Sequence, residues 1–110
     1  MSGWSRGDVV LVRYPFSDLS STEAHPALVA GAPHSSRDLI VVPLNSRASG
    51  LLAGEFALAD WAAAGRNVLT AVKRGLYTFH ERLVLRTVGR LNTGSMQRVA
   101  ESLRMWMGLA

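Results

Sequence analysis

Hydrophobic residues in this chain fall into short runs that polar and turn-forming residues separate. The first run, Asp8 to Arg13, is rich in valine and lies between Gly7 and Pro15, which predicts a mostly buried β-strand. A polar stretch follows, and Pro26 then restricts the chain to an extended entry into a second strand, Ala27 to Ala30. The opening third therefore predicts two strands joined by a loop.

Further short runs predict further strands. Asp38 to Leu44 is the clearest of them, and Pro43 places the end of this strand at a sheet edge or a bulge. The weaker predictions are strands at Glu55 to Leu58, Val68 to Lys73 and Thr87 to Leu91, a single turn within 77–82, and at most one helical turn at Asp60 to Ala64. Regularly spaced short strands are typical of a small β-barrel.

One amphipathic helix is predicted at the end of the chain. It begins after Asn92, a good N-cap residue, and ends at Gly108. Its apolar positions recur at spacings of three and four: Met96, Val99, Ala100, Leu103 and Met107. With no internal repeat and no linker-like composition, residues 1–110 are predicted to form a single mainly β domain, a small barrel closed by a terminal helix.

The amino-acid composition excludes several kinds of chemical site. The 110 residues include no cysteine, which excludes disulfides, cysteine-type zinc sites and thiol nucleophiles. His34 and His80 have no partner at a metal-ligand spacing, so neither a metal nor another cofactor is expected. No apolar run is long enough for a signal peptide or a membrane span, which predicts a cytoplasmic protein with no membrane partner.

Charge is distributed unevenly along the chain. The formal charge is +4, but residues 66–110 carry eight Lys or Arg against two acids, whereas residues 1–65 carry four against six. A basic half favours a polyanionic partner such as RNA or an acidic protein segment, although such an asymmetry also occurs in proteins that bind neither.

Three stretches resemble the signatures of the PemK/MazF toxin family. These are Arg6 to Val12 continuing through Tyr14 to Leu19, then His25-Pro26-Ala27-Leu28-Val29, and Leu39 to Arg47. Shorter matches at 59–61, 64–65 and 88–91 extend the resemblance over nearly the whole chain. It implies an SH3-like β-barrel that forms a homodimer, cleaves single-stranded RNA without a metal, and is held silent by a cognate antitoxin.

Two positions depart from the family pattern. Where the family has an arginine that contacts the reacting phosphate, this chain has His25, and where it has a catalytic threonine, this chain has Asn45. Histidine can transfer protons near neutral pH, whereas Asn45 and Ser46 can donate hydrogen bonds to a phosphoryl oxygen and Arg47 can supply the missing charge. A solvated histidine, ordinary turn residues and a surface arginine are the alternative interpretations.

Other residues are candidates for RNA contact. Lys73, Arg74 and Arg86 can bind phosphates, and on an extended segment Arg86 and Arg90 are expected to face one side. Tyr14 and Phe16 can stack on bases, although aromatic residues at strand ends more often serve packing.

Three classes of function stay open. The first is a metal-independent endoribonuclease toxin that uses His25, Asn45, Ser46 and Arg47. The second is a catalytically silent relative that binds RNA or an antitoxin segment, and the third is an SH3-like protein-interaction module.

Overall fold

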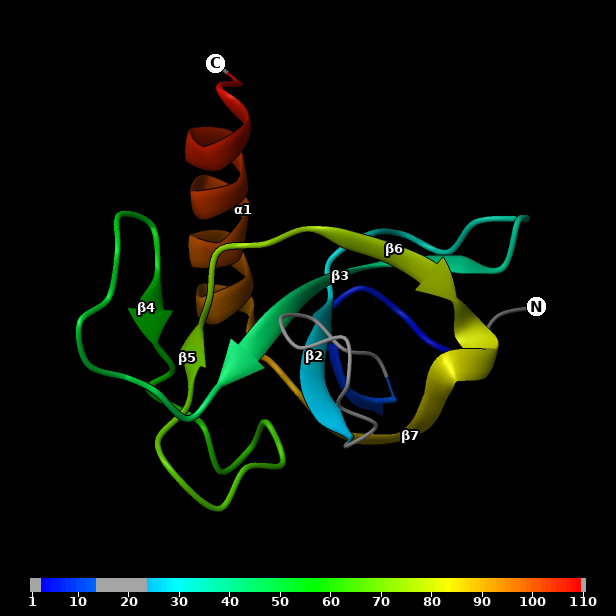
Figure 1. Ribbon diagram of the computed structural model, residues 1–110, viewed down its shortest axis with the longest axis horizontal. Coiled ribbons are helices and arrows are strands. Elements are labelled where there is room, and N and C mark those ends of the chain that lie inside the picture. Colours follow the sequence, from blue (N-terminus) through cyan, green and yellow to red (C-terminus); the bar gives the residue numbers. More distant parts are fainter. Residues whose placement is uncertain (1–2, 14–23, 110) are drawn as a thin grey trace.

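Antiparallel strands form one strongly curved sheet in the computed structural model, which describes residues 3–13 and 24–109. The elements in chain order are β1 (Asp8–Val12), β2 (His25–Val29), β3 (Asp38–Asn45), β4 (Phe56–Ala57), β5 (Ala71–Val72), β6 (Tyr77–His80), the 3₁₀ helix η1 (Glu81–Leu83), β7 (Val84–Arg90) and α1 (Thr93–Met107). In Figure 1 the strands curl around a common interior, and α1 stands to one side of them beside β4 and β5. The predicted mainly β, barrel-like fold with one C-terminal helix is confirmed.

Strand β3 organises the sheet. The strand order is β4-β5-β3-β2-β1-β7, and β6 pairs with the first half of β3 on the edge that β5 occupies further along. Pro43 lies where this edge changes partner, and its carbonyl accepts a hydrogen bond from the Lys73 amide at 3.0 Å. The carbonyl and the nitrogen of one strand residue point to the same side, so the Pro43 nitrogen also faces the edge shared by β6 and β5. Proline has no N–H to donate, and its nitrogen lies at the gap between these two strands, where no partner strand needs a donor. β3 can therefore run on to Asn45, beyond the predicted strand end.

Two local predictions differ from the structure. Residues 77–80, predicted as part of a turn, form β6, because Tyr77 to His80 pair with the start of β3. The turn follows at η1. Of the predicted strand Val68 to Lys73 only Ala71 and Val72 are paired, and Val68 and Leu69 are largely exposed. In both cases a strand partner distant in sequence decided where the strand begins.

The terminal helix has the predicted ends. The Asn92 side chain accepts a hydrogen bond from the Ser95 amide at 2.8 Å, and Gly108 ends the helix with a left-handed φ of 68°. Met96 and Val99 face the sheet and are buried. Along the part of the chain that the structure describes, no helix combines the length and apolar character needed to cross a bilayer.

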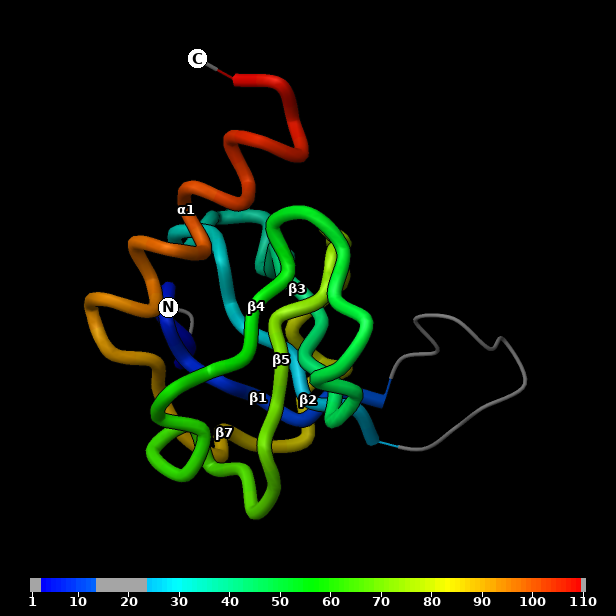
Figure 2. The backbone as a smooth tube through the Cα atoms, turned by 90° about the vertical axis from the view of Figure 1, so that its left-hand side faces the viewer, coloured from blue at the N-terminus to red at the C-terminus, as the bar shows by residue number. Residues whose placement is uncertain are grey.

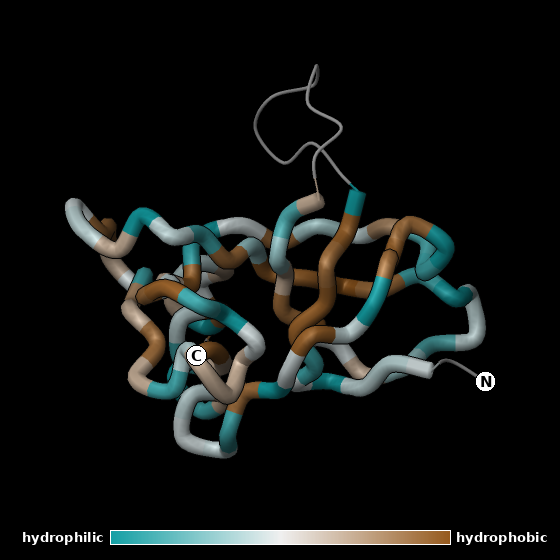
Figure 3. The backbone as a smooth tube through the Cα atoms, turned by 90° about the horizontal axis from the view of Figure 1, so that it is seen from below, coloured by the Kyte–Doolittle hydropathy of each residue, from teal (hydrophilic) through white to brown (hydrophobic). Residues whose placement is uncertain are grey.

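Side chains that alternate along the strands pack into two hydrophobic clusters, one on each face of the curved sheet. The inner cluster comprises Val10, Val12, Ala27, Val29, Leu39, Val41 and Phe79. The outer cluster joins the sheet to the helix through Val9, Leu28, Val42, Leu44, Phe56, Leu58, Met96 and Val99, among others. Figure 3 shows hydrophobic and hydrophilic stretches following one another along the backbone, and Figure 2 shows α1 extending beyond the sheet toward the C-terminus. The first half of the helix thus closes one face of the sheet.

Candidate functional site

The start of β2 and the end of β3 each carry one predicted site residue. The β2–β3 pairing ends with Ala27 opposite Pro43, and His25 and Asn45 each lie two residues beyond that pair. On its other side His25 pairs with Val12, which packs in the inner cluster. Side chains alternate along a strand, so His25 and Asn45 lie on the same face at one end of the sheet.

A tight turn follows Asn45. Its Oδ1 accepts a hydrogen bond from the Arg47 amide at 2.7 Å, the Asx-type contact that asparagine often makes in turns. Asn45, Ser46 and Arg47 are all exposed, whereas His25 is half-buried. Because the Asn45 oxygen holds the turn, its amide NH₂ is the group that can donate to a ligand.

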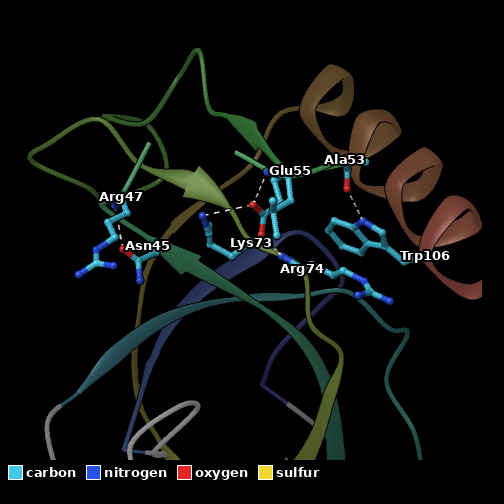
Figure 4. Close-up of polar contacts among 8 residues, drawn as sticks. Asn45, Arg47, Ala53, Glu55, Lys73, Arg74 and Trp106 are labelled. Atoms are coloured by element: carbon cyan, nitrogen blue, oxygen red, sulfur yellow. Dashed lines mark hydrogen bonds and ion pairs between the residues drawn. The ribbon is translucent and has the colours of Figure 1, made fainter. Parts of the chain in front are cut away.

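Strand β5 adds a cation to the same face. Ala71 pairs with Asn45, so Lys73, two residues further along, projects from the side of the sheet that carries Asn45. The Lys73 ammonium lies 3.3 Å from a carboxylate oxygen of Glu55, whose side chain is only 5% exposed. Figure 4 shows this pair beside the turn at Asn45. Lys73 is therefore held at the edge of the site.

Glu55 anchors this arrangement, and sequence reasoning did not identify it. Its carboxylate accepts hydrogen bonds from the amides of Leu52 and Arg74, both at 2.8 Å. Burial raises the pKa of Glu55, but these two amides and the charge of Lys73 outweigh burial and hold that pKa below its ordinary value. The β4–β5 pairing brings Glu55 to Lys73, and no local sequence pattern indicates that pairing.

The other predicted cations lie elsewhere. Arg74 is exposed and points toward Trp106 on α1, on the side of Lys73 away from Asn45 (Figure 4). Arg86 pairs with Leu11, the neighbour of Val12, so it projects from the opposite face of the sheet to His25. These two arginines therefore do not join the cluster of His25, Asn45 and Lys73.

The expectation that Arg86 and Arg90 face one side is wrong. Between them the β1–β7 pairing shifts by one residue, because Val9 is opposite Gly89 whereas Val10 is opposite Thr87. Such a bulge reverses the alternation of side chains along the strand. Arg90 instead bonds Asp8 at 2.7 Å and the Arg6 carbonyl at 3.1 Å, a structural role.

Tyr14 and Phe16, the predicted base-stacking residues, lie outside the described residues. The described chain stops at Arg13, after β1, and resumes at Ala24, before β2. Arg13 and Ala24 adjoin the strand ends that carry Val12 and His25.

The cluster unites chemically different groups on one exposed end of the sheet. His25 can take or give a proton, the Asn45 amide and the Ser46 hydroxyl can donate hydrogen bonds, and Lys73 and Arg47 carry positive charge. Among residues 3–13 and 24–109, no group of three His, Cys, Asp or Glu side chains is placed to hold a metal ion. The arrangement is suited to binding an anion and moving a proton beside it.

Comparisons with known proteins identify the fold. No protein-family model and no curated protein matches the chain. Several solved structures match the chain. One is an endoribonuclease from a mycobacterial species in complex with its cognate antitoxin, which is 18% identical, with a TM-score of 0.74 over 100% of this chain and 98% of that one. The Mycobacterium tuberculosis toxin MazF-mt6 is 18% identical, with a TM-score of 0.73 over 94% and 98% of the two chains.

MazF from Deinococcus radiodurans is 17% identical, with a TM-score of 0.72 over 96% of each chain. At these identities the likeness establishes the fold, which is that of the MazF toxins over 94% to 96% of the chain. The family resemblance predicted from the sequence is thus confirmed in the architecture.

Proposed function

We propose that this chain is the toxin of a type II toxin–antitoxin pair, a dimeric endoribonuclease that cleaves single-stranded RNA without a metal. The proposal combines the MazF-type fold with the composition of the site. Its RNA-facing surface is the end of the sheet formed by the start of β2, the end of β3 and the residues that follow β5.

One observation carries the proposal. His25 and Asn45 occupy the two positions that the family resemblance marks as catalytic. Although 20 positions separate them in sequence, each lies two residues beyond the last β2–β3 pair, Ala27 and Pro43, and on the same face of the sheet. Both residue types have changed, yet each replacement can bind or protonate a phosphate oxygen. Lys73 adds a fixed cation on the same face.

Each residue has a role in the cleavage step. The 2′-oxygen of the nucleotide attacks the adjacent phosphorus, the bond to the 5′-oxygen breaks, and the products are a 2′,3′-cyclic phosphate and a free 5′-hydroxyl. His25 serves as the proton-transfer group, which takes the 2′-hydroxyl proton or delivers one to the leaving 5′-oxygen. The Asn45 amide, Ser46 and Arg47 bind the phosphate oxygens, where negative charge increases in the transition state.

The direct test is RNA cleavage in EDTA. Purified protein is incubated with a long single-stranded RNA, and the cut ends are mapped beside a His25→Ala variant and a His25→Arg variant that carries the family residue. We expect discrete cuts with cyclic-phosphate ends and a loss of at least about a hundredfold in rate for His25→Ala. His25→Arg should lose as much, because an arginine stays charged and cannot transfer a proton. Cleavage retained by His25→Arg would assign position 25 to phosphate binding instead. Equal cleavage by His25→Ala would remove His25 from the mechanism.

A second candidate function is supported by the turn at Asn45. Because the side-chain oxygen of Asn45 is used to hold the turn, Asn45 also has a purely structural explanation. A silent relative would bind RNA or an antitoxin segment and leave the RNA intact. Binding that weakens as salt rises, without any cuts, would favour this candidate over the nuclease.

The expected protein partner is a cognate antitoxin. The mycobacterial structure contains its antitoxin, and a Deinococcus radiodurans structure pairs MazE with MazF. The basic C-terminal half of this chain suits an acidic partner of that kind. Co-expression with the product of a neighbouring small acidic gene, followed by an RNA cleavage assay, tests this partnership.

A further inference from the structure

A small pocket lies at the end of β3 opposite to the end that carries Asn45. It forms where the loop between β2 and β3 folds over β3 and β6, and it encloses about 290 Å³. Figure 1 shows this loop, residues 30–37, at the upper right beside β6, on the side of the molecule away from β4 and β5. The lining residues are Ala32, His34, Ser36, Asp38, Ile40 and Thr78. None of them belongs to the cluster at His25.

The loop that forms the pocket is tied to the sheet at both ends. At its start, the amides of Ala30 and Gly31 both donate to the Ile40 carbonyl, at 2.8 and 3.3 Å. At its end, the Glu81 amide donates to the Arg37 carbonyl at 3.0 Å, and the Arg37 guanidinium forms an ion pair with the Glu81 carboxylate. The pocket is therefore preformed.

Hydrogen bonds inside the loop decide which ring nitrogen of His34 carries the hydrogen. The Ser36 amide donates to His34 Nδ1 at 3.0 Å, and the Ser36 hydroxyl lies 2.8 Å from the same nitrogen. An amide N–H can only donate, so in the neutral imidazole Nδ1 is the acceptor and Nε2 carries the hydrogen. The Ser36 oxygen in turn accepts the Asp38 amide at 3.2 Å. His34 thus has one N–H donor left for a ligand.

Asp38 contributes an acceptor that no described side chain uses. It is the first residue of β3 and is half-buried. Within residues 3–13 and 24–109 its carboxylate forms no ion pair, and among these residues no Lys or Arg lines the pocket. A partly buried carboxylate without a donor is unfavourable, and a ligand that brings N–H groups removes this cost.

The floor of the pocket is apolar. Ile40 is 42% exposed, although Val42 on the same face of β3 is fully buried. A Cβ on Gly31 would begin 3.1 Å from the Ile40 Cβ, so the loop backbone lies directly against this side chain. Thr78 is opposite Ile40 on β6 and adds a hydroxyl. An apolar floor with a carboxylate, an N–H and a hydroxyl around it suits a heterocyclic ring.

We propose that this pocket binds a guanine base. Guanine has two adjacent donors on one edge, N1–H and the N2 amino group, which match the two oxygens of the Asp38 carboxylate, and its O6 accepts from His34 Nε2 or the Thr78 hydroxyl. Adenine and cytosine would turn an unprotonated ring nitrogen toward the carboxylate, and uracil has a single N–H. Since none of the described lining residues is a Lys or Arg, the phosphate of a nucleotide stays outside.

This inference does not rest on the proposed function, because the pocket shares no residue with the cluster at His25. The base of a free nucleotide and an unpaired guanine of an RNA offer the same edge to Asp38. The experiments below separate these two sources.

Nucleotide titrations test the pocket directly. The probes are GMP, IMP and AMP, added to the ¹⁵N-labelled full chain and followed in ¹H–¹⁵N correlation spectra. All three have the same ribose and phosphate, and IMP differs from GMP only by lacking the N2 amino group, so differences between them report on the base. Wild type is compared with Asp38→Asn. The control is Glu101→Gln, which removes one exposed carboxylate from α1.

We expect GMP to cause saturable shifts at residues 30–40 and 77–80 of wild type and of Glu101→Gln. Binding should be about tenfold or more weaker for IMP, and for GMP with Asp38→Asn, and AMP should cause no saturable shift there. The proposal is overturned by equal binding of GMP and AMP, by an unchanged affinity of Asp38→Asn with an intact thermal transition, or by GMP shifts centred on His25 and Asn45. Absence of any saturable GMP shift overturns it too.

A short RNA with one unpaired G, compared with the same RNA carrying A at that position, identifies the source of the base. Tighter binding of the G-containing RNA than of GMP, lost in Asp38→Asn, assigns the pocket to RNA, and binding no tighter than that of GMP assigns it to a free nucleotide. RNA cleavage is measured on the same wild-type sample. GMP binding without cleavage would overturn the nuclease alone, and cleavage without GMP binding would overturn the pocket alone.

Discussion

Single side chains in this protein combine a structural contact with a position suited to chemistry. Asn45 holds the turn through its oxygen and has its NH₂ group left for a ligand. Glu55 gathers two loop amides and Lys73. Because each of these residues makes a structural contact, a simple deletion lowers stability and activity together, and only paired substitutions separate the two effects.

Two substitutions of Asn45 separate its structural contact from its proposed role in cleavage. Asn45→Ala removes the acceptor of the Arg47 amide and should lower the free energy of unfolding by about 1 kcal/mol. Asn45→Asp keeps an acceptor oxygen but loses the NH₂ donor, so stability should be retained while RNA cleavage falls by about a hundredfold. Denaturant unfolding and cleavage assays on both variants measure this. Wild-type cleavage by Asn45→Asp would exclude the donor role.

Glu55 should make stability depend on pH. Its folded pKa lies below the ordinary value of about 4.3, so the carboxylate stabilises the fold above that pH, and this contribution is lost as the pH falls through the folded pKa. At pH 7, Glu55→Gln should cost about 1 to 3 kcal/mol of unfolding free energy, and the difference from wild type should shrink in acid.

Glu101, an exposed glutamate on α1, provides the matched control for Glu55. Glu101→Gln should change the unfolding free energy by less than about 0.5 kcal/mol at either pH. A loss for Glu55→Gln that stays constant down to acid pH would contradict the role of the ionised carboxylate.

Whole elements are positioned by close backbone contacts as well as by side chains. The turn at 60–65 packs directly on β7, where Arg90 donates its amide to the Ala63 carbonyl at 3.3 Å. Gly65 has a φ of +81°, and a Cβ there would overlap the Val88 carbonyl oxygen. Val88 is also the residue at which the β1–β7 register shifts. The turn at 60–65 and the bulge at Val88 of β7 therefore pack against each other without room for a side chain at Gly65.

This fit predicts different costs for two glycines with similar backbones. Gly50 has a φ of +65°, and a Cβ there would meet open space, so Gly50→Ala should cost only the left-handed strain, about 1 kcal/mol. Gly65→Ala adds the clash with β7 and should cost about 2 kcal/mol more. Denaturant unfolding of the two variants measures the difference. Equal losses would show that the turn can move away from β7.

At the scale of the whole molecule, the small size of the domain makes association with a second copy relevant to its stability. A chain of 110 residues buries a modest core, and the proposed association with a second copy would add to its stability. We expect a sedimentation-equilibrium mass of about twice 11.9 kDa. A monomer at every concentration would contradict the dimer.

Local pattern was sufficient for much of the architecture. The valine-rich run of β1, the long β3, and α1 with Asn92 and Gly108 at its ends were predictable, because alternation, capping and turn preference act within a few residues. The same pattern, with the family resemblance, selected His25 and Asn45 as candidates. β6 escaped prediction, since four residues with one buried side chain carry too weak a local signal.

The sequence by itself therefore determined most of the elements, their order and the residue types available for chemistry. Only the tertiary structure decided how these residues are placed: His25 and Asn45 both lie just beyond the last β2–β3 pair, Glu55 meets Lys73 through the short β4–β5 pair, and a bulge turns Arg86 away from Arg90. Register and bulges depend on hydrogen bonding and packing between segments far apart in the chain. A pattern that repeats every few residues carries no information about such contacts.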